Sequence, residues 1–450
     1  MRIAVVGGGI SGLAAAWLLG RCCEVTLFEA GEQAGGHSNT VSVPEPVGAG
    51  ESRQVPIDTG FIVYNRLNYP HLTALFDHLA VPTAASDMSF AASLEDGGLE
   101  YAGDHPGKLF GQPANLLRVS HWRMIGEILR FNRHARDWLA AGRDRGETLQ
   151  EFLDAAGFSP RLAERYLLPM AAAIWSAPRT EIGRFPAASL LGFFRNHGLL
   201  QVRNRPQWRT VRGGSREYVR RLLADFGGRV RTATPVTAVR PQEGGVRVSH
   251  SGGTEQFDQV VLAVHADQAR SLLEEAHPEA TRLLADVRFS HNRAVLHSDP
   301  ALMPRRRRLW ASWNYLSDGS SDADRRVSVS YWMNRLQPLD SERDYFVSLN
   351  PLREPDPDRC WYRTDYSHPV LDAAALRIQQ QLPALQGRRG IWFAGAWTRY
   401  GFHEDGMRSA LWVANALGVA APWQSLEARG GGARVAGRHA RMAQAAVEEA

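Results

Sequence analysis

Lysine is almost absent from this chain. The 450 residues include 52 lysines and arginines together, and Lys108 is the only lysine. It lies in a segment rich in glycine and proline, so a mechanism that depends on a lysine has a single, unfavourable candidate. Acidic residues number 47, which leaves a net charge of +5. That charge is too small to indicate a nucleic-acid partner, although it is compatible with weak attraction to an anionic lipid surface.

Cysteine and long apolar runs are also scarce. The cysteines are Cys22, Cys23 and Cys360, which are too few for a disulfide framework, and two of them are adjacent. This usage is typical of a reducing cytoplasm. No apolar run approaches the ~20 residues that a membrane-spanning helix needs. A strand-like segment follows Met1 and Arg2 directly, so we expect no signal peptide. We predict no metal site.

The chain begins with a glycine-rich turn between two regular elements. Residues 3–6 are apolar and mostly β-branched, which predicts a strand buried on both faces. Gly7-x-Gly9-x-x-Gly12 follows, and residues 13–19 then have the composition of a helix. In a dinucleotide-binding unit the first glycine allows a tight turn and the second lets the backbone approach a pyrophosphate. The third lets the helix pack close to the strand.

The next elements complete this unit. Residues 24–28 predict a second strand, which ends at Glu29, a residue placed to accept hydrogen bonds from an adenosine ribose. The helix N-terminus offers free N–H groups and a partial positive charge to the phosphates. We therefore predict a dinucleotide whose adenosine and phosphate groups contact Gly7, Gly9, Ile10, Ser11, Gly12, Glu29 and Ala30.

A second pair of glycines comes shortly after this acidic residue. Gly35 and Gly36 precede His37 and Ser38. Paired glycines again allow the backbone to approach a ligand closely, here with a small hydroxyl donor beside them. The position predicts a second contact to the phosphates.

Together these motifs resemble the FAD fingerprint of the amine oxidase and carotenoid desaturase superfamily, in which GxGxxG and a terminal Glu precede Gly-Gly-[basic]-x-x-[Ser/Thr]. The resemblance implies non-covalent FAD as the cofactor, with the paired glycines continuing the pyrophosphate site. It also implies that the segment with Gly60 and Phe61 passes the isoalloxazine ring and that the backbone of Val236 contacts adenine. His37 stands where the superfamily usually has arginine.

The chain returns to the cofactor near its end. An apolar strand ends at Gly395 and a helix is predicted to begin near Gly406, a pattern that resembles the superfamily's C-terminal FAD motif. The dipole of this helix is expected to stabilise negative charge at N1 and O2 of the reduced flavin. Ala396 replaces the acid that usually binds the ribityl chain. The contacts predicted here are Gly395, Ala396, Gly406, Met407 and Ala410.

The predicted fold class is α/β, with a Rossmann-like FAD-binding domain of the amine oxidase and glutathione reductase type interleaved with an α+β substrate domain. We expect the FAD-binding domain to be discontinuous, over residues 1–72, 206–268 and 388–420. The substrate domain is expected over residues 73–205 and 269–387. Residues 421–450 form a C-terminal tail that is either a weak polar helix or flexible.

Several segments of the substrate domain have alternative interpretations. Residues 122–139 interleave large apolar residues with arginines, which predicts a long amphipathic helix whose basic face is either solvated or in contact with a membrane surface or lipid. The consecutive arginines 305–308 form either a solvated loop or a contact for an anionic surface. Residues 166–176 and 193–200 are rich in large apolar side chains, which suit a substrate cavity and a helical core equally.

Further segments resemble one narrower family of bacterial FAD-dependent, amine-oxidase-like proteins. These are typically encoded near cyclopropane-fatty-acid-synthase-like methyltransferases, and relatives act in making furan or methyl-branched unsaturated fatty acids. The matching segments are Asp58–Asn65, Pro169–Ser176, Asn196–Leu200, Arg205–Trp208 and Gly401–Gly406.

The narrower resemblance implies a FAD-dependent oxidoreductase that oxidises (desaturates) a lipid acyl chain by hydride transfer to flavin N5. The expected substrate is a methylated or unsaturated fatty acid in phospholipid. The implied partners are this lipid, an anionic membrane surface and a cyclopropane-fatty-acid-synthase-like methyltransferase, with no nucleic acid. The expected location is the cytoplasm, either free or peripheral on the inner membrane face.

An acyl carbon is a poor acid, so catalysis must come mainly from precise placement in a dry cavity. Candidate bases or proton relays are His403, Glu404 and His197, and Tyr64 is expected to wall the flavin or guide the chain. His403 and Glu404 are equally well interpreted as residues that order the flavin loop. Two other functions stay open, namely a flavin amine oxidase acting on a small amine or polyamine, and a non-catalytic flavoprotein partner of a fatty-acid methyltransferase.

Overall fold

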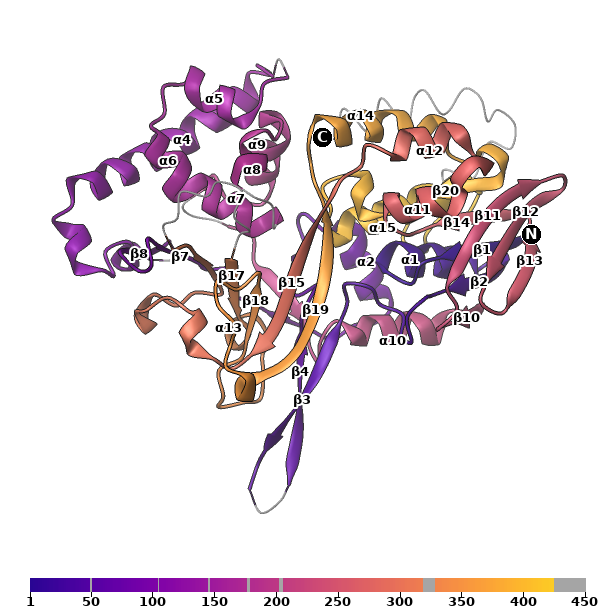
Figure 1. Ribbon diagram of the computed structural model, residues 1–450, viewed down its shortest axis with the longest axis horizontal. Coiled ribbons are helices and arrows are strands. Elements are labelled where there is room, and N and C mark those ends of the chain that lie inside the picture. The colour runs from indigo at the N-terminus through magenta and orange to yellow at the C-terminus, as the bar shows by residue number, and fades with distance from the viewer. Residues whose placement is uncertain are drawn as a thin grey trace.

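A parallel sheet with the strand order β10-β2-β1-β14-β20 forms one half of the protein (Figure 1). The computed structural model describes residues 1–48, 51–103, 105–144, 146–175, 179–201, 205–318 and 328–424. The strands are β1 Arg2–Val6, β2 Glu24–Phe28, β10 Arg229–Arg231, β14 Gln259–Leu262 and β20 Ile391–Phe393. Three separate parts of the chain thus build one sheet.

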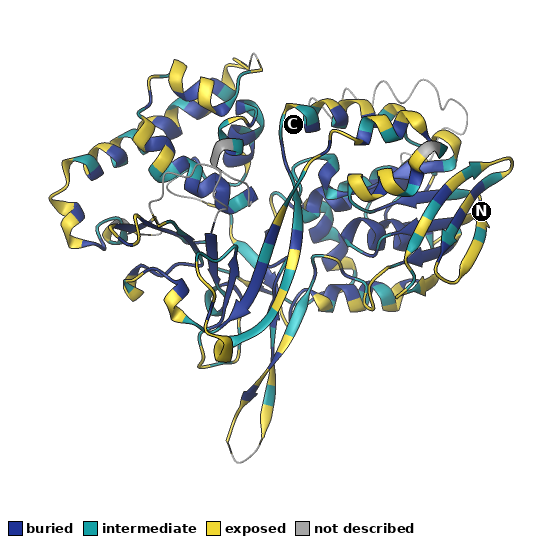
Figure 2. Cartoon of the chain, in the orientation of Figure 1, coloured by how far each residue is buried: buried dark blue, intermediate teal, exposed yellow. Residues whose placement is uncertain are grey.

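Both faces of this sheet are buried, as the continuous apolar composition of β1 predicts (Figure 2). Successive side chains of a strand point to opposite faces, so Ile3 and Val5 join one core cluster while Ala4 and Val6 join another. The first cluster is covered by α1 Ile10–Leu19, α2 Pro70–His78, α10 Arg216–Asp225 and α15 His403–Ala416. The second is covered by α11 Ala266–Leu273, α12 Pro278–Leu284 and α14 Ala373–Gln381.

An antiparallel sheet lies against the second cluster. It contains β11 Val236–Gln242, β12 Gly245–His250 and β13 Gly253–Phe257. Its inward residues Val239, Val246 and Val248 are fully buried. The antiparallel sheet thus covers the face of the parallel sheet that carries Ala4, Val6 and Phe28.

The other half of the protein contains a seven-stranded sheet with the order β19-β15-β18-β17-β16-β7-β8. Its strands are β7 Phe90–Leu94, β8 Leu99–Ala102, β15 Phe289–His297, β16 Trp313–Leu316, β17 Ser328–Trp332, β18 Phe346–Leu349 and β19 Cys360–Pro369. The long pair β15 and β19 runs from this sheet towards the parallel sheet (Figure 1). It therefore connects the two halves.

A group of helices packs on the seven-stranded sheet and shares its apolar core. The longer ones are α4 Val119–Ala140, α5 Leu149–Ala155, α7 Leu168–Trp175 and α9 Ala187–Asn196. The shorter ones are α3 Pro106–Leu109, α6 Pro160–Leu162, α8 Arg179–Gly183 and α13 Met333–Leu336. Helix α4 has the amphipathic character that its sequence predicts, with Met124, Phe131 and Trp138 buried on one side.

Two small sheets join the halves. One is the hairpin of β3 Thr40–Pro46 and β4 Ser52–Asp58, which projects from the body (Figure 1). The other has the order β5-β9-β6, with β5 Tyr64–Asn65, β6 Thr83–Ala85 and β9 Trp208–Val211. Val43, Val55 and Ile57 of the hairpin belong to the core of the helical half, whereas Tyr64 and Val211 of the second small sheet belong to that of the parallel sheet.

The observed elements agree with the predicted α/β fold and its second, α+β part. The domain boundaries remain predictions.

The last cofactor helix, α15, begins at His403 and not near Gly406, because the side chain of Asp405 caps it by accepting from the backbone of Phe402 (2.9 Å). The tail from residue 425 onward lies outside the described residues. None of the described helices is long and apolar enough to cross a bilayer.

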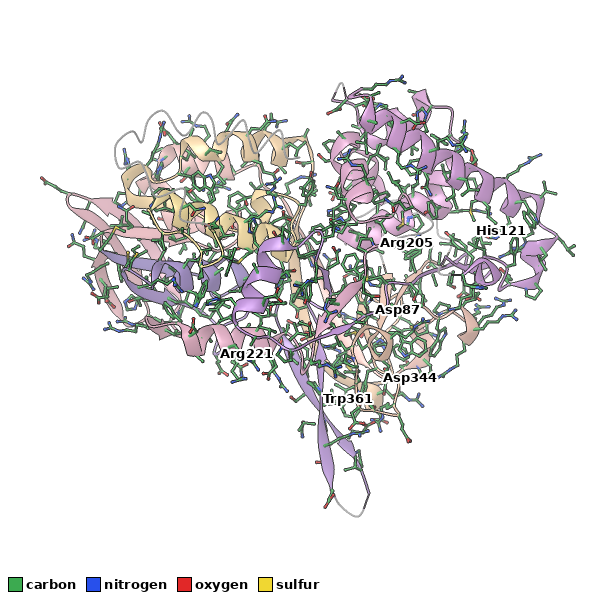
Figure 3. All side chains as sticks on the ribbon, turned by 180° about the vertical axis from the view of Figure 1, so that it is seen from behind. Asp87, His121, Arg205, Arg221, Asp344 and Trp361 are labelled. Atoms are coloured by element: carbon green, nitrogen blue, oxygen red, sulfur yellow. The ribbon has the colours of Figure 1, made fainter. Side chains whose placement is uncertain are left out.

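Arg305, Arg307 and Arg308 are exposed and Arg306 is half-buried, which agrees with the interpretation of residues 305–308 as a solvated loop. Arg306 pairs with the fully buried Glu100 (2.5 Å), and Arg307 pairs with Asp344 (2.8 Å), which Figure 3 labels. Arg305 pairs with Asp96. Three of the four arginines thus attach this loop to the turn between β7 and β8, to β8 and to the segment before β18, and their contact with an anionic surface stays a prediction.

Candidate active site

The first glycine motif forms a close junction at the carboxyl end of β1. Gly7 has φ +104°, and its N–H donates to the carbonyl of Phe28 (2.8 Å). A Cβ at this position would lie 2.5 Å from the carbonyl oxygen of Ala263, and one at Gly12 would lie 1.8 Å from that of Gly7. Strand and helix therefore approach more closely than any side chain allows, which is the role the motif predicts.

Gly9 differs from its neighbours because it faces open space. A Cβ there would meet no atom within 4 Å. Gly9 is also the N-cap of α1 and has no capping side chain, so the first N–H groups of the helix, at Ile10 and Ser11, are available to a ligand. The second glycine pair closes this space from the other side: Gly35 donates to the carbonyl of Gly8 (2.8 Å).

Glu29 lies at the end of β2, as predicted. Its carboxylate accepts the backbone N–H groups of Gly8 and Gly31, each at 2.7 Å, which fixes its orientation and leaves further lone pairs free. The backbone of Thr234 donates to the carbonyl of Glu29 (2.9 Å), and this brings the segment before Val236 to the same place. Ala30 is exposed beside it. Contacts of these residues to adenosine stay predictions.

We call the space bounded by Gly9, Ile10, Ser11 and Gly35 the cradle. His37 lies beside it, because it follows Gly36, whose Cβ would lie 3.0 Å from the Cα of Gly9. Its Nε2 is buried and has no hydrogen-bond partner among the described residues. Its ring stacks on Tyr366 of β19, with the ring centroids 4.9 Å apart. Burial, together with neighbouring histidines, keeps its pKa well below the usual value. An orphaned nitrogen, an open glycine and an uncapped helix N-terminus together fit a bound dinucleotide.

Two more histidines lie beside His37 that the sequence did not single out. The ring of His368 on β19 is 5.5 Å from it, and that of His265, just before α11, is 6.3 Å away. Burial lowers the pKa of His368 to about 4. His265 lies three residues after the end of β14, and ligands gather at the carboxyl ends of parallel strands, so its place in the sequence could have marked it as a site residue.

The C-terminal motif packs against the start of α1. Gly395 donates its N–H to the Ser409 hydroxyl (2.9 Å), and a Cβ on Gly406 would lie 2.8 Å from both Ile10 and Ser11 side chains. The two helix starts, α1 and α15, are therefore side by side. Met407 and Ala410 are fully buried in the core between these helices, so only their backbone remains for the predicted contact, and Ala396 is half-buried.

His403 is enclosed by the paired-glycine loop and the segment after β4. Its ring stacks on Phe61 at 3.7 Å between centroids, and its Nε2 lies 3.0 Å from the hydroxyl of Ser38. Phe61 donates its backbone N–H to the carbonyl of His37 (2.7 Å), and a Cβ on Gly60 would lie 2.3 Å from the same carbonyl oxygen. Burial lowers the pKa of His403 to about 3, so the ring is neutral.

Replacing His403 with glutamine is expected to weaken FAD binding by about tenfold, because the stacked ring fixes the start of α15. The imidazole is neutral throughout the range of about pH 5 to 8, so this residue contributes no titration to the affinity of the unmodified protein there. FAD titration followed by flavin fluorescence at several pH values measures both effects. His134→Gln on α4 is the control. A step in affinity near pH 6.5 that the substitution removes would contradict a neutral, positioning histidine.

Glu404 faces away from the cradle. Its carboxylate accepts the backbone N–H groups of Leu72 (2.9 Å) and His71 (3.2 Å) in the first turn of α2, and Arg408 donates to it as well (3.2 Å). It therefore caps α2 from a distant part of the chain. These contacts favour the structural interpretation of Glu404 over the catalytic one.

Tyr64 and His197 occupy different environments. Tyr64 is buried in the core between Phe76 and Tyr69, which are edge-on to it, so the structure does not bring it into the cradle. His197 follows α9 and stacks on Phe193 at 3.8 Å between centroids. Its Nδ1 donates to the carbonyl of Phe193 (3.0 Å), and burial lowers its pKa to about 4, so its Nε2 carries a free lone pair.

Asp58 is a polar centre that its sequence context does not reveal. It is completely buried and accepts hydrogen bonds from the hydroxyl of Thr40 (2.6 Å), from Ser215 (2.8 Å) and from the side chain of Gln337 (2.8 Å). Burial raises its pKa to about 6. Asp58 thus connects the hairpin, the start of α10 and the loop after α13, two residues before Gly60 in the chain.

The described residues hold no group of three or more histidine, cysteine, aspartate or glutamate side chains that is arranged to bind a metal ion.

No curated protein matches the sequence. Among solved structures, the fold is similar to cyclohexylamine oxidase from Brevibacterium oxydans IH-35A, with a TM-score of 0.63 and 16% identity over 93% of this chain and 99% of that one. It is also similar to a CLA-producing fatty acid isomerase from P. acnes, with a TM-score of 0.64 and 15% identity over 91% and 96% of the two chains.

Putrescine oxidase bound to putrescine has the same fold, with a TM-score of 0.61 and 15% identity over 93% of this chain and 99% of that one. At these identities the similarity shows the fold and no more. The sequence itself goes further, because residues 10–296 match the family of flavin containing amine oxidoreductases. That match spans more than half of the chain, so this protein belongs to the flavin containing amine oxidoreductase family and is a FAD-dependent oxidoreductase.

Proposed function

We propose that the protein oxidises (desaturates) the acyl chain of a lipid. The proposed substrate is a methylated or unsaturated fatty acid that is esterified in a phospholipid. The observation that carries the proposal is an aromatic wall that reaches the cofactor motif from the helical half. Phe193 on α9 stacks on Phe402, the residue before α15, with the centroids 4.9 Å apart, and Trp175 on α7 lies 4.7 Å from Phe193. Such a wall binds an apolar chain by removing it from water.

A pocket of about 350 Å³ lies at the C-terminal end of α9, the helix that carries Phe193. Arg66, Arg195 and Arg209 line it together with amide side chains, and none of its lining residues is acidic. Asn196 and Gly198, on either side of His197 in the chain, are part of the same lining. Its hydrogen-bond donors suit a phosphate or carboxylate, so an amphiphile with an anionic head and an apolar tail matches both the pocket and the wall.

When bound, FAD supplies a two-electron acceptor. Removing a hydride from one carbon of the chain leaves a proton on the adjacent carbon for the protein to take up as the double bond forms. His197 is the residue proposed to accept it, because its ring is neutral and its Nε2 lone pair is free. The residues proposed to hold FAD are Gly9, Ile10, Ser11, Glu29, Gly36, His37, Gly395 and Ala396.

An amine or polyamine substrate is the second candidate, and the similarity of the fold to putrescine oxidase and cyclohexylamine oxidase favours it. The arginine-lined pocket argues against it, since a protonated amine is repelled there. A non-catalytic partner of a fatty-acid methyltransferase is the third candidate, and Ala396 at the place of the usual ribityl ligand is the observation in its favour.

Anaerobic mixing of the FAD-loaded protein with phospholipid that carries methylated unsaturated chains tests the proposal. We expect bleaching of the flavin absorbance at about 450 nm and a product that lacks one pair of hydrogens by mass spectrometry. Bleaching by putrescine or spermidine, and none by the lipid, would establish the amine oxidase. No bleaching by any of these, together with stoichiometric co-purification of a methyltransferase, would establish the non-catalytic partner.

Substitution of His197 by asparagine is expected to lower kcat on the lipid by about 10²–10⁴-fold, as for the loss of a general base. Because burial holds the pKa of His197 to about 4, the unmodified protein should retain its activity as the pH falls from 8 towards 5. His134→Asn is the matched control and should leave kcat unchanged. An activity that survives His197→Asn, with flavin content intact, would show that another group takes the proton.

A further inference from the structure

Large apolar side chains are exposed together at one end of the helical half. Five of the nine such side chains among the described residues lie between positions 116 and 129. The exposed fraction is 90% for Leu117 and 65% for Val119. We call the group the apolar tip, and it consists of Leu116, Leu117, Val119, Trp122 and Leu129. A cluster of this kind on a protein surface usually marks a binding site.

The geometry of α4 directs these side chains outward. Trp122 and Leu129 are seven residues apart and therefore lie on one side of the helix. The opposite side is anchored in the core by Met124 and Phe131. His121, whose side chain is buried, marks this anchored side in Figure 3 at the extreme end of the molecule, far from the parallel sheet. The apolar tip therefore cannot turn inward without breaking the core.

The indole of Trp122 is fixed with its polar edge satisfied. Its Nε1 donates to the carbonyl of Leu116 (3.0 Å), and its ring packs against Phe110 with the centroids 4.6 Å apart. The remaining ring surface is half exposed, at 51%. An indole with a bonded N–H and a free apolar face matches the boundary between lipid headgroups and acyl chains.

Cationic side chains border the apolar tip. Arg118, Arg123, Arg130 and Arg133 are all exposed. In the part of the chain that the structure describes, Arg123 and Arg133 have no acidic partner, whereas Arg130 approaches Glu127 at 3.8 Å. The border is therefore net positive, and it surrounds the tip with charges that anionic lipid headgroups attract.

We propose that the apolar tip and its arginine border dock the protein on the surface of an anionic phospholipid bilayer. The apolar side chains would enter the boundary between headgroups and acyl chains, while the arginines pair with phosphates above them. A second copy of this chain fits less well, because a symmetric contact would bring the same arginines together. The inference is independent of which molecule is oxidised.

Sedimentation of the full-length, FAD-loaded protein with vesicles tests the docking. We expect binding to vesicles of phosphatidylglycerol and phosphatidylcholine, and at least about tenfold weaker binding to phosphatidylcholine alone. The variant Leu117→Ser/Trp122→Ser should reduce partitioning into the anionic vesicles by about tenfold or more, since the apolar contact is lost. Arg123→Gln/Arg133→Gln should abolish the preference for the anionic lipid.

The double variant Val47→Ser/Val230→Ser is the matched control, because Val47 and Val230 are exposed elsewhere, at 47% and 37%. It should bind as the unmodified protein does. Flavin absorbance and thermal melting confirm that every variant is folded. Equal partitioning of all variants would overturn the proposal. So would a self-association that only Leu117→Ser/Trp122→Ser removes, because it would assign the apolar tip to contact between copies.

Discussion

Replacing Gly9 with valine should abolish FAD binding while leaving the protein folded. The structure leaves open space around this position, since a Cβ there would meet no protein atom within 4 Å, and the backbone at φ −74° and ψ −177° is accessible to valine. The substitution should therefore lower the affinity for FAD without lowering the stability of the protein. A branched side chain at the uncapped start of α1 would occupy the space next to Ile10 and Ser11 in which the phosphates are predicted to lie. We expect a loss of at least about 100-fold in FAD affinity.

The measurement is FAD titration of the apoprotein, together with a melting curve of the same sample. The apoprotein of Gly9→Val should melt within about 2 °C of the unmodified apoprotein, as expected for a change of less than about 0.5 kcal/mol. Gly227→Val is the matched control, because a Cβ at Gly227 also meets no atom within 4 Å, but after α10 and away from the cradle. Normal FAD affinity of Gly9→Val would move the phosphates away from the start of α1.

Removal of the Glu404 side chain should cost about 2–4 kcal/mol of unfolding free energy. Helix α2 begins without a capping side chain, as Tyr69 offers none, and the buried carboxylate supplies the missing acceptor. Glu404→Ala leaves the N–H groups of His71 and Leu72 and the guanidinium of Arg408 without this partner. Urea unfolding followed by tryptophan fluorescence measures the loss.

Glu404→Gln separates this structural role from a catalytic one. The amide oxygen still accepts one helix N–H group, so we expect a smaller loss of about 1–2 kcal/mol and a kcat close to that of the unmodified protein. Glu217→Ala is the control, since it removes an exposed ion pair with Arg220 on α10. A Glu404→Gln protein with full stability and flavin content but no turnover would show that Glu404 is catalytic.

Local patterns in the sequence predict the cofactor cradle well. The positions of Gly7, Gly9 and Gly12 follow from the immediate alternation of strand, turn and helix, and the structure gives each the packing that the motif requires. The amphipathic period of α4 predicts its buried side in the same way. Such features depend on neighbours within a few residues, so the sequence contains the whole of the relevant information.

Contacts between distant segments are not predictable in this way. Glu404 caps a helix that precedes it by more than 300 residues, and Asp58 collects donors from Ser215 and Gln337. Nothing in the local sequence around Glu404 separates a cap from a general base, since both need only a carboxylate. The grouping of His265 and His368 around His37 depends equally on how β14 and β19 meet in space. The choice between a catalytic and a structural role for Glu404 depends on such contacts, and the catalytic assignments stay predictions.

The strand order of the parallel sheet determines when the sheet can form during synthesis of the chain. Strand β1 emerges first from the ribosome, yet its neighbour β14 lies about 250 residues later, and the edge strand β20 follows near residue 391. At typical rates of synthesis, β20 is made about 20 to 80 seconds after β1. During that interval the apolar β1 and α1 have no complete sheet to join. A slow, chaperone-dependent maturation in which FAD enters only after the C-terminal segment arrives is the expected consequence for biogenesis.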